Sequence, residues 1–444
     1  MAVKIVESHS VSPSSGAAAE HTLPLLYFDI IWFDFVLTKP LFFYALKCSQ
    51  SHFLDTILVN LKHSLSLTLK HFLPLASKII FPLTSSAMPV SRYTTGDSLS
   101  LVIATSDDDF SHVVSNHPKP AADFHQLVAQ MPAAVYSSDE IKFSALAIQL
   151  TLFPNQGICI GFTHHHSICD ATTLNAFLHM WASINNSNVI EQLPFYGRDS
   201  VQDSTKLTMI HWDKMKTNRP TVSLAPPSPS DKVRATFHLS NPQIEKLKRW
   251  VAIKKPSIGR PSSFVVACAY LWSCLAKSEV DKDDDDETQY LCSPVNCRGR
   301  LDPPLPENYF GNCSIQLIAA SSHGKLKGND GFVAAAEAVA GAVKIAVKSS
   351  RVSEFYENRS EILSELKGKR VVWVAGSTKV DQHGADYGWG RAVKYECIHT
   401  DFNGAVHLCK GRQGGIDMGF SMPKPNIFSF ASIFNKYLFI NSNL

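Results

Sequence analysis

The sequence predicts an α/β or α+β protein of two domains, with mixed sheets flanked by helices. Its 444 residues suffice for two to three domains of about 150 residues each. Segments with strand and helix patterns alternate in both halves of the chain. The proline-rich run at 221–231 (TVSLAPPSPSD) cannot continue a helix or a central strand, and it divides the chain almost in half. We therefore expect an N-terminal domain at 1–220, a linker at 221–231 and a C-terminal domain at 232–444.

The composition is that of a folded globular protein. Hydrophobic residues make up 45% of the chain and charged residues 18%, which excludes disorder as the main state. Lys and Arg number 42 against 39 for Asp and Glu, so the net charge is only +3. Because so small a charge provides no field that would attract nucleic acid, we expect no nucleic-acid partner.

The cysteines and the N-terminus indicate a cytoplasmic protein. The ten cysteines are scattered and form no C-x-x-C pair, which is typical of reduced, buried thiols in an intracellular chain. The N-terminus has no apolar stretch of signal-peptide length. The most hydrophobic region, Leu23–Leu46, is interrupted by charged residues, so we expect no membrane-spanning helix and no membrane partner.

Two helices and two strands are predicted in the first half. Leucines three or four residues apart in Phe53–Ser77 indicate an amphipathic helix that ends at Pro74. Ala145–Leu152 and Gly157–Thr163 are apolar runs separated by Phe-Pro-Asn-Gln, a pattern typical of two strands joined by a turn. Ala171–Ser183 has apolar residues at helical spacing. A cluster of histidines therefore lies between a strand and a helix.

The second half begins with a predicted strand at Lys232–Leu239, after which Ser240 caps a helix at 242–252. Ser262–Lys277 is predicted as a buried helix, because it is almost continuously apolar behind two serines. The acidic run at 281–287 must be solvated and is predicted as a surface loop. The remaining predicted elements are strands at 290–295, 313–319 and 370–375 and an alanine-rich helix at 332–347.

The main group of reactive side chains is His164-His165-His166-Ser167-Ile168-Cys169-Asp170. On a helical turn His166 and Asp170 would share a face, whereas in a looser loop the aspartate could turn away and hold the segment. A histidine near its free pKa is the natural general base for a hydroxyl or amine nucleophile at neutral pH. The pattern therefore indicates a general base at His166.

Three other interpretations of this cluster stay open. His164 and His165 are also typical of strand-end residues with satisfied hydrogen bonds, and His166 of an ordinary core histidine. A metal site would need further ligands at suitable spacing, and no C-x-x-C or H-E-x-x-H accompanies the cluster. We therefore expect no metal.

Two further motifs stand out in the second half. In Asp386-Tyr387-Gly388-Trp389-Gly390 two glycines flank a tryptophan, which favours a tight backbone that holds a large ring and its N–H donor at a fixed point. The other motif is YFGNC at 309–313, directly after a proline-rich segment.

In this order and spacing, the three motifs resemble the BAHD family of plant acyl-CoA-dependent acyltransferases. The resemblance covers essentially the whole chain, from Tyr27-Phe28-Asp29 through H-x-x-x-D to the DFGWG-like motif. The YFGNC segment resembles the branch that acylates anthocyanins, other flavonoids and phenolic glycosides. Tyr387 stands where the family motif has Phe.

The resemblance implies a two-domain, chloramphenicol-acetyltransferase-like fold with an active-site channel at the domain interface. His166 would take the proton from an acceptor sugar hydroxyl as this oxygen attacks the thioester carbonyl. Asp170 would pair with Arg298 and hold the backbone that aims His166. Acyl-CoA would be a co-substrate, with no permanently bound cofactor, and the protein would be a monomer.

The resemblance also implies roles for other residues. Trp389 would donate its indole N–H to the oxyanion or the acyl carbonyl, or else the whole motif would only brace the fold. Ser262 and Ser263 resemble the region that contacts CoA, because a helix N-terminus suits phosphate, and Lys254 would add positive charge there. The motif residues given a structural role are Asp386, Tyr387, Gly388, Gly390 and Arg298.

The expected reaction is acyl transfer to a sugar hydroxyl of an anthocyanin, flavonoid or phenolic glycoside, with a malonyl or hydroxycinnamoyl donor. Ala171 and Thr172 follow Asp170, whereas malonyl-transferring relatives often have a basic residue there, so the sequence favours an aromatic donor. Two alternatives stay open, an N-acyltransferase that acts on a polyamine or other amine and a catalytically silent protein that binds phenolics or CoA esters.

Overall fold

The computed structural model describes residues 1–83, 87–187, 189–190, 192–217, 231–279, 285–348 and 350–440. Apart from Asp231, the predicted linker at 221–231 lies outside the described residues, as does the first part of the acidic run, 281–284. The division of the chain at 220 and 232 therefore stays a prediction. Residues 285 and 286, in the second part of the acidic run, form an exposed turn, as expected of a surface loop.

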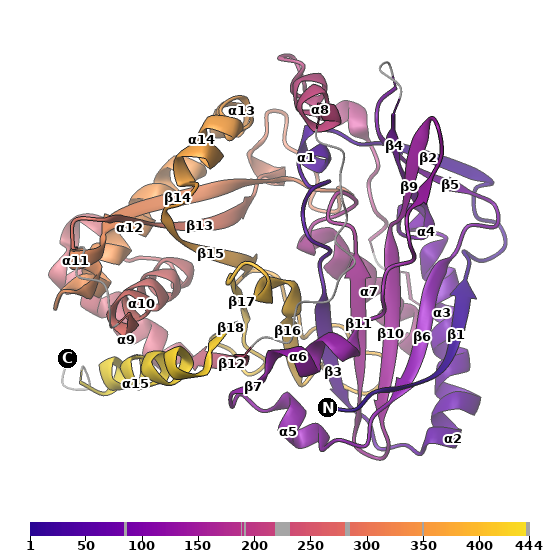
Figure 1. The fold of residues 1–444 in the computed structure, drawn as a ribbon, viewed down its shortest axis with the longest axis horizontal. Coiled ribbons are helices and arrows are strands. Elements are labelled where there is room, and N and C mark those ends of the chain that lie inside the picture. The colour runs from indigo at the N-terminus through magenta and orange to yellow at the C-terminus, as the bar shows by residue number, and fades with distance from the viewer. Residues whose placement is uncertain are drawn as a thin grey trace.

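Two bodies lie side by side in Figure 1, one formed mainly by each half of the chain. The first body contains a six-stranded sheet in which β10 and β11 form a hairpin at the centre. Every residue of these two strands is buried, as their apolar sequences predict. In sheet order the strands are β1 (Lys4–Val11), β6 (Leu99–Thr105), β10 (Leu146–Phe153), β11 (Gly157–His164), β3 (Pro40–Ala45) and β16 (Lys394–Cys397).

A five-stranded antiparallel sheet completes the first body, together with its helices. The strands of this sheet are β2 (Glu20–Pro24), β5 (Val90–Thr94), β4 (Lys78–Pro82), β9 (Glu140–Ser144) and β8 (Val135–Tyr136). The helices are α1 (Tyr27–Ile30), α2 (Gln50–His52), a π-helix (Phe53–Ile57), α3 (Leu58–Leu69), α4 (Leu73–Ala76), α5 (Phe110–Val114), α6 (Ala121–Phe124), α7 (Ala171–Ser187) and α8 (Leu207–Thr217).

The second body is a seven-stranded mixed sheet with helices packed against it (Figure 1). Its strands in order are β14 (Ser314–Ser322), β13 (Thr288–Asn296), β15 (Arg370–Ser377), β17 (Val406–Lys410), β18 (Ile416–Pro423), β12 (Lys232–Leu239) and β7 (Lys119–Pro120). Its helices are α9 (Asn241–Lys254), α10 (Ser263–Ser278), α11 (His323–Lys327), α12 (Gly331–Ala346), α13 (Arg351–Glu357), α14 (Arg359–Leu366) and α15 (Lys424–Ile440).

The predicted elements are confirmed within a few residues at their ends. The strand predicted at Lys232–Leu239 has these bounds in β12, and Ser240 caps α9 by accepting the backbone N–H of Gln243. The helix predicted over Phe53–Ser77 is interrupted, because it begins with a π-helical turn and breaks between α3 and α4. The break follows from Pro74, which is tolerated in the first turn of α4 but not inside a continuing helix.

The two bodies exchange short strands. β16, from the second half of the chain, pairs with β3 of the first body, and β7, from the first half, pairs with β12 of the second body. The buried side chain of Arg234 on β12 reinforces this exchange, because it donates to Glu396 on β16 at 3.1 Å and to Asp401 at 2.8 Å. These contacts fix the position of β12 of the second body against β16 in the sheet of the first body.

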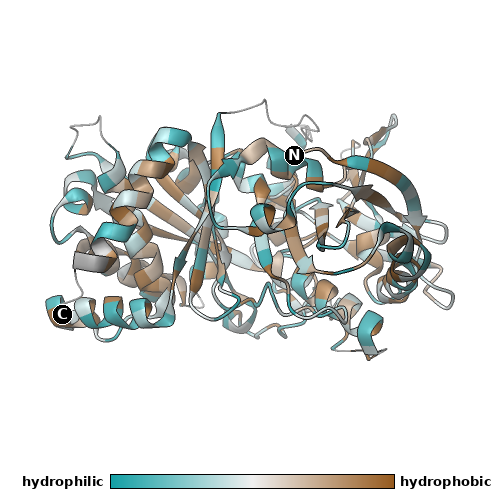
Figure 2. Cartoon of the chain, turned by 90° about the horizontal axis from the view of Figure 1, so that it is seen from below, coloured by the Kyte–Doolittle hydropathy of each residue, from teal (hydrophilic) through white to brown (hydrophobic). Residues whose placement is uncertain are grey.

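Apolar side chains form one large core in each body. Brown, apolar stretches run through the strands of both bodies in Figure 2, and many teal, polar stretches lie along the outer helices and loops. The core of the first body includes Tyr387 and Tyr395 from the second half of the chain, and the core of the second body includes Tyr27 and Phe28 from the first half. Each core therefore contains residues from both halves of the chain. All ten cysteines are buried as free thiols, as predicted. Among the described residues, no helix is long and apolar enough to cross a membrane.

Candidate active site

The H-x-x-x-D motif lies in a turn between β11 and α7. β11 ends at His164, residues 166–168 form a turn, and α7 begins at Ala171. Asp170 precedes this helix and caps it, since its Oδ1 accepts the backbone N–H of Thr173 at 3.0 Å. The motif is therefore the looser loop that the sequence analysis left open, and Asp170 does not share a helical face with His166.

Asp170 pairs with Arg298 of the second half. Arg298 Nη1 donates to Asp170 Oδ2 at 2.8 Å, and Nη2 donates to Oδ1 at 3.0 Å. Burial raises the pKa of Asp170, but the guanidinium and the N–H donors outweigh burial and hold this pKa below its usual value. The carboxylate is therefore charged at neutral pH, and the bidentate pair ties the motif to the second half.

The same arginine holds the YFGNC segment beside the H-x-x-x-D motif. Arg298 Nη2 also donates to the backbone carbonyl oxygens of Gly311 at 2.9 Å and Tyr309 at 3.1 Å. Asp170 Oδ2 in turn accepts the backbone N–H of Cys313 at 3.2 Å. The two sequence motifs therefore form one hydrogen-bonded unit around an ion pair whose guanidinium is fully buried.

His166 lies at the junction of the two bodies, in an aromatic environment. Its ring stacks on Trp32, with centroids 4.0 Å apart and an interplanar angle of 9°, and it meets the ring of Phe35 edge-on at 5.2 Å. Burial lowers the pKa of His166 from its ordinary value of 6.5, although the charge of Asp170 opposes this shift. His166 is therefore neutral at pH 7, the form that a general base requires.

The two preceding histidines have structural partners. The ring of His164 lies 2.6 Å from Thr38 Oγ1, and His165 Nδ1 lies 2.8 Å from Ser167 Oγ. Burial lowers the pKa of His165 to about 3, so this ring is neutral at physiological pH. The contacts of His164 match the strand-end interpretation, whereas Nε2 of His165 is buried without a hydrogen-bond partner, so His165 is only partly satisfied.

A second buried ion pair, which the sequence analysis missed, lies on the other side of YFGNC. Asp29 Oδ1 accepts both the backbone N–H and the side-chain amide of Asn312 at 3.0 Å, and the same amide donates to the carbonyl oxygen of His166 at 3.0 Å. Arg198 Nη2 lies 3.4 Å from Asp29 Oδ2. Asp29 belongs to the Tyr27-Phe28-Asp29 segment that resembles the family, but nothing in the sequence indicated its partners, which lie far along the chain.

The DYGWG motif is a tight loop whose side chains brace the first core. Asp386 Oδ1 accepts the N–H groups of Gly388 and Gly390 at 2.8 Å, and both glycines have positive φ, which explains why glycine is needed there. Tyr387 is buried and meets Trp181 of α7 edge-on at 5.1 Å.

The structure does not bring Trp389 to His166. The indole of Trp389 packs against Tyr44 and Tyr387, at centroid distances of 5.9 and 5.4 Å. Tyr44 pairs with Ile158 at the start of β11, whereas His164 is the last residue of this strand. At a rise of about 3.3 Å per residue, the two ends of β11 are separated by about 20 Å.

The residues predicted to contact CoA lie in the second body. Ser262 caps α10 by accepting the backbone N–H of Val265 at 3.3 Å, and Ser263 is the first residue of this helix. Lys254 lies at the end of α9, where its exposed ammonium group is 3.7 Å from the carboxylate of Asp330. Among the described residues none of these three contacts His166, and their role in binding CoA stays a prediction.

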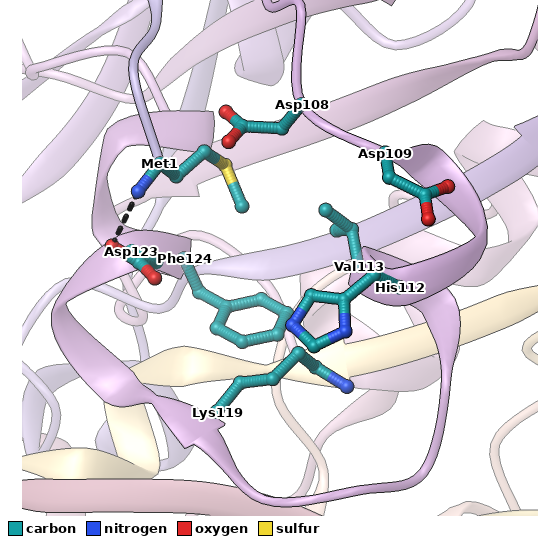
Figure 3. Close-up of a pocket in the computed structure, with 8 residues that line it drawn as sticks. All are labelled: Met1, Asp108, Asp109, His112, Val113, Lys119, Asp123 and Phe124. Atoms are coloured by element: carbon teal, nitrogen blue, oxygen red, sulfur yellow. Dashed lines mark hydrogen bonds and ion pairs between the residues drawn. The ribbon is translucent and has the colours of Figure 1, made fainter.

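Two cavities and one group of potential metal ligands lie outside the His166 turn. Figure 3 shows a cavity of about 380 Å³ beside the N-terminus, where the amino group of Met1 contacts Asp123 at 2.9 Å. A cavity of about 510 Å³ is lined by Thr172 and Asn175 of α7 and by residues of the second half. Within the described part of the chain, His383, Cys409 and Asp417 have potential ligand atoms within 4.8 Å of one another. None of these three residues belongs to the predicted site.

The comparisons with known proteins agree with this architecture. The crystal structure of vinorine synthase aligns with a TM-score of 0.71 over 96% of both chains, at 18% identity, which establishes the fold. This likeness confirms the predicted chloramphenicol-acetyltransferase-like fold. The sequence profile of the Transferase family matches residues 1–436. The chain belongs to this family, the BAHD acyl-CoA-dependent acyltransferases, as its motifs predicted.

Two curated relatives extend this result. The malonyl-coenzyme:anthocyanin 5-O-glucoside-6'''-O-malonyltransferase of Salvia splendens is 38% identical over 436 residues, covering 95% of this chain and 93% of the relative. The coumaroyl-CoA:anthocyanidin 3-O-glucoside-6''-O-coumaroyltransferase 1 of Arabidopsis thaliana is 31% identical over 452 residues, covering 97% and 96%. Both names describe acyl transfer to a glucoside, with different acyl donors.

Proposed function

We propose that this acyltransferase moves an acyl group from acyl-CoA to a sugar hydroxyl of an anthocyanin, flavonoid or phenolic glycoside, with His166 as general base. The observation that carries the proposal is a neutral imidazole at the junction of the two bodies, on a turn tied to the second body by the Asp170–Arg298 pair. The names of the two relatives support the class of acceptor.

The mechanism follows from the position and protonation state of His166. The neutral imidazole accepts the proton of the sugar hydroxyl as the oxygen attacks the thioester carbonyl, forming a tetrahedral intermediate. The C–S bond then breaks, the acyl group stays on the sugar oxygen, and the CoA thiolate accepts the proton. No acyl-enzyme is needed, because the hydroxyl attacks the thioester directly. Asp170 acts at a distance, by holding the turn that carries His166.

The choice of acyl donor depends on charge near the start of α7. Thr172 carries no charge, which favours a hydroxycinnamoyl donor, and the aromatic rings of Trp32 and Phe35 beside His166 agree with this.

Arg300 and Lys379, however, line the same cavity as Thr172, so positive charge that could bind a malonyl carboxylate is available from the second half. Two acids, Glu307 and Asp381, also line this cavity. The carboxylate of Asp381 is paired with Arg391 at 2.9 Å. The greater identity to a malonyltransferase makes malonyl-CoA the first donor to test.

The test is a CoA-release assay with an anthocyanidin or flavonol glucoside and either malonyl-CoA or p-coumaroyl-CoA. We expect release with one donor and none with His166→Ala. If malonyl-CoA is the donor, Arg300→Gln is expected to raise KM for malonyl-CoA and to leave KM for the glucoside acceptor unchanged. Wild-type activity of His166→Ala would overturn the mechanism. Release with amine acceptors alone would favour an N-acyltransferase, and silence with all acceptors would favour a binding protein.

We also propose that the protein is a cytoplasmic monomer that binds CoA at the N-terminus of α10. Ser262, Ser263 and Lys254 would contact the phosphates there, in keeping with the affinity of a helix N-terminus for anions. Light scattering during size-exclusion chromatography tests the monomer, and imaging of a fluorescent fusion tests the location. Lys254→Gln is expected to raise KM for acyl-CoA, while Lys248→Gln, on the same helix, serves as a matched control.

A further inference from the structure

The hydrogen bond of the Asn312 side chain opposes the lowering of the pKa of His166 by burial, but it leaves one nitrogen of the imidazole ring without a partner. Nδ1 of His166 is buried and has no hydrogen-bond partner, whereas a general base is commonly oriented by a group that binds its second ring nitrogen. The Asp170–Arg298 pair holds the backbone after His166 but does not touch the ring. The side chains packed against the ring therefore contribute to its orientation.

Trp32 covers one face of this ring. The two rings are nearly parallel, with an interplanar angle of 9° and centroids 4.0 Å apart, and Phe35 closes one edge at 5.2 Å. A flat indole at this distance prevents the imidazole from tilting towards it. The stack therefore sets the plane in which His166 can present its free nitrogen to a substrate.

The segment that carries Trp32 is itself anchored to His166. The backbone N–H of Trp32 donates to the carbonyl oxygen of Asp29 at 3.1 Å. The side chain of Asp29 accepts from Asn312, whose amide also donates to the carbonyl oxygen of His166 at 3.0 Å. The contacts thus form a closed cycle, from the backbone of His166 through Asn312, Asp29 and Trp32 back to the imidazole ring.

We propose that Trp32 is a positioning residue that orients the imidazole of His166 by stacking, and that Asp29 and Asn312 hold Trp32 in place. The proposal rests on the proposed function, since it assigns Trp32 a role only if His166 is the base. The Asp170–Arg298 pair fixes where the turn lies, and the Trp32 stack fixes how the ring is directed. Both are needed, because the reacting atoms must be aligned at close range for proton transfer.

The experiment compares three substitutions of Trp32 in the full chain. Trp32→Leu and Trp32→Met remove the flat face, and the longer Met side chain fills more of the space. We expect kcat to fall roughly 10-fold to 100-fold with KM for both substrates within about twofold, because misalignment by about 1 Å is enough for such a loss. Trp32→Phe keeps a flat ring and is expected to restore kcat to within roughly fivefold of wild type.

One control and one further variant separate the positioning of His166 from a general loss of stability. Trp250→Leu removes a buried tryptophan from the second core, where its ring packs on Phe332 at 5.0 Å, and it is expected to lower the melting temperature without changing kcat of the folded enzyme. Asp29→Asn keeps the indole but loosens its anchor, and it is expected to lower kcat in the same way as Trp32→Met.

The outcomes are distinguishable from failure of the proposed function. Unchanged kcat in both Trp32→Leu and Trp32→Met would overturn the positioning role. A raised KM for the acceptor with unchanged kcat would also overturn it, because the indole would then bind substrate instead of orienting the base. If Trp32→Leu does not fold, the comparison of Trp32→Met with Trp32→Phe decides the question. Activity in His166→Ala would instead contradict the base itself.

Discussion

Arg298 donates two parallel hydrogen bonds to Asp170, at 2.8 and 3.0 Å, across 128 residues of sequence. The guanidinium is fully buried, so removing its partner would leave an uncompensated charge inside the protein. We expect Asp170→Asn to lower the free energy of unfolding by about 3–5 kcal/mol and to reduce kcat. Urea titration and steady-state kinetics measure the two effects.

Asp213→Asn is the matched control for this substitution. Asp213 is exposed and pairs with Lys216 on the surface, so its loss is expected to change the free energy of unfolding by less than about 0.5 kcal/mol. If Asp170→Asn loses activity while its stability stays at the wild-type value, the aspartate acts directly in the reaction and not by holding the turn.

The pH dependence of the reaction reports on His166. Burial lowers its pKa below 6.5, although the charge of Asp170 and the hydrogen bond with the side chain of Asn312 oppose this shift. The neighbouring rings of His164, His165 and His399 are neutral at pH 7, because burial lowers their pKa values as well. A base must be deprotonated, so kcat/KM is expected to stay constant above pH 7 and to fall with a midpoint below 6.5 as the pH is lowered. A pH profile between about 5 and 8 tests this. A midpoint above 6.5 would contradict it.

Much of the local structure could be predicted from the sequence. The strand at 232–239 and the helix that begins near Ser262 have clear periodicity and caps, and both are observed within a residue of the predicted bounds. The H-x-x-x-D motif also identified the histidine and the aspartate, and the resemblance to the family identified the arginine partner. The prediction worked because periodicity and capping depend on neighbouring residues, and the motifs contain the reactive groups themselves.

The rest depends on contacts that no local pattern contains. Asp29 meets Asn312 across 283 residues of sequence, and β16 adds a strand to the other body although it has only four residues. Trp32 looked like one more apolar residue in a hydrophobic run, because nothing near it in the sequence marks the ring on which it stacks. Such partners are determined by the tertiary arrangement, which brings chemically plain residues next to the site.

Trp389 provides a test of the two roles considered for the DYGWG motif. Trp389→Phe removes the indole N–H but keeps a ring that can stack on Tyr387. Because Trp389 packs at the far end of β11 from His164, we expect kcat of this variant within about twofold of wild type. Loss of an oxyanion donor would instead lower kcat by roughly 100-fold to 1,000-fold.

Asp386→Ala, which releases two N–H groups of the loop, is expected to lower the melting temperature.

The last prediction concerns the acid sensitivity of the junction between the two bodies. Glu396 on β16 is buried, which raises its pKa, but Lys394 and Arg234 outweigh this and hold the pKa at about 2. Because the folded pKa lies below the ordinary value of 4.5, the unfolded chain binds more protons between these two values. The charged glutamate therefore stabilises the fold at neutral pH, and its contribution is lost as the pH falls from about 4.5 towards 2.

Glu396→Gln should lower the melting temperature at pH 7, and the difference in melting temperature from wild type should shrink as the pH falls from about 4.5 towards 2. Asp417→Asn, with a partly exposed carboxylate in the same half, is the control. A difference that stays constant with pH would show that Glu396 stabilises the junction through shape and not through charge.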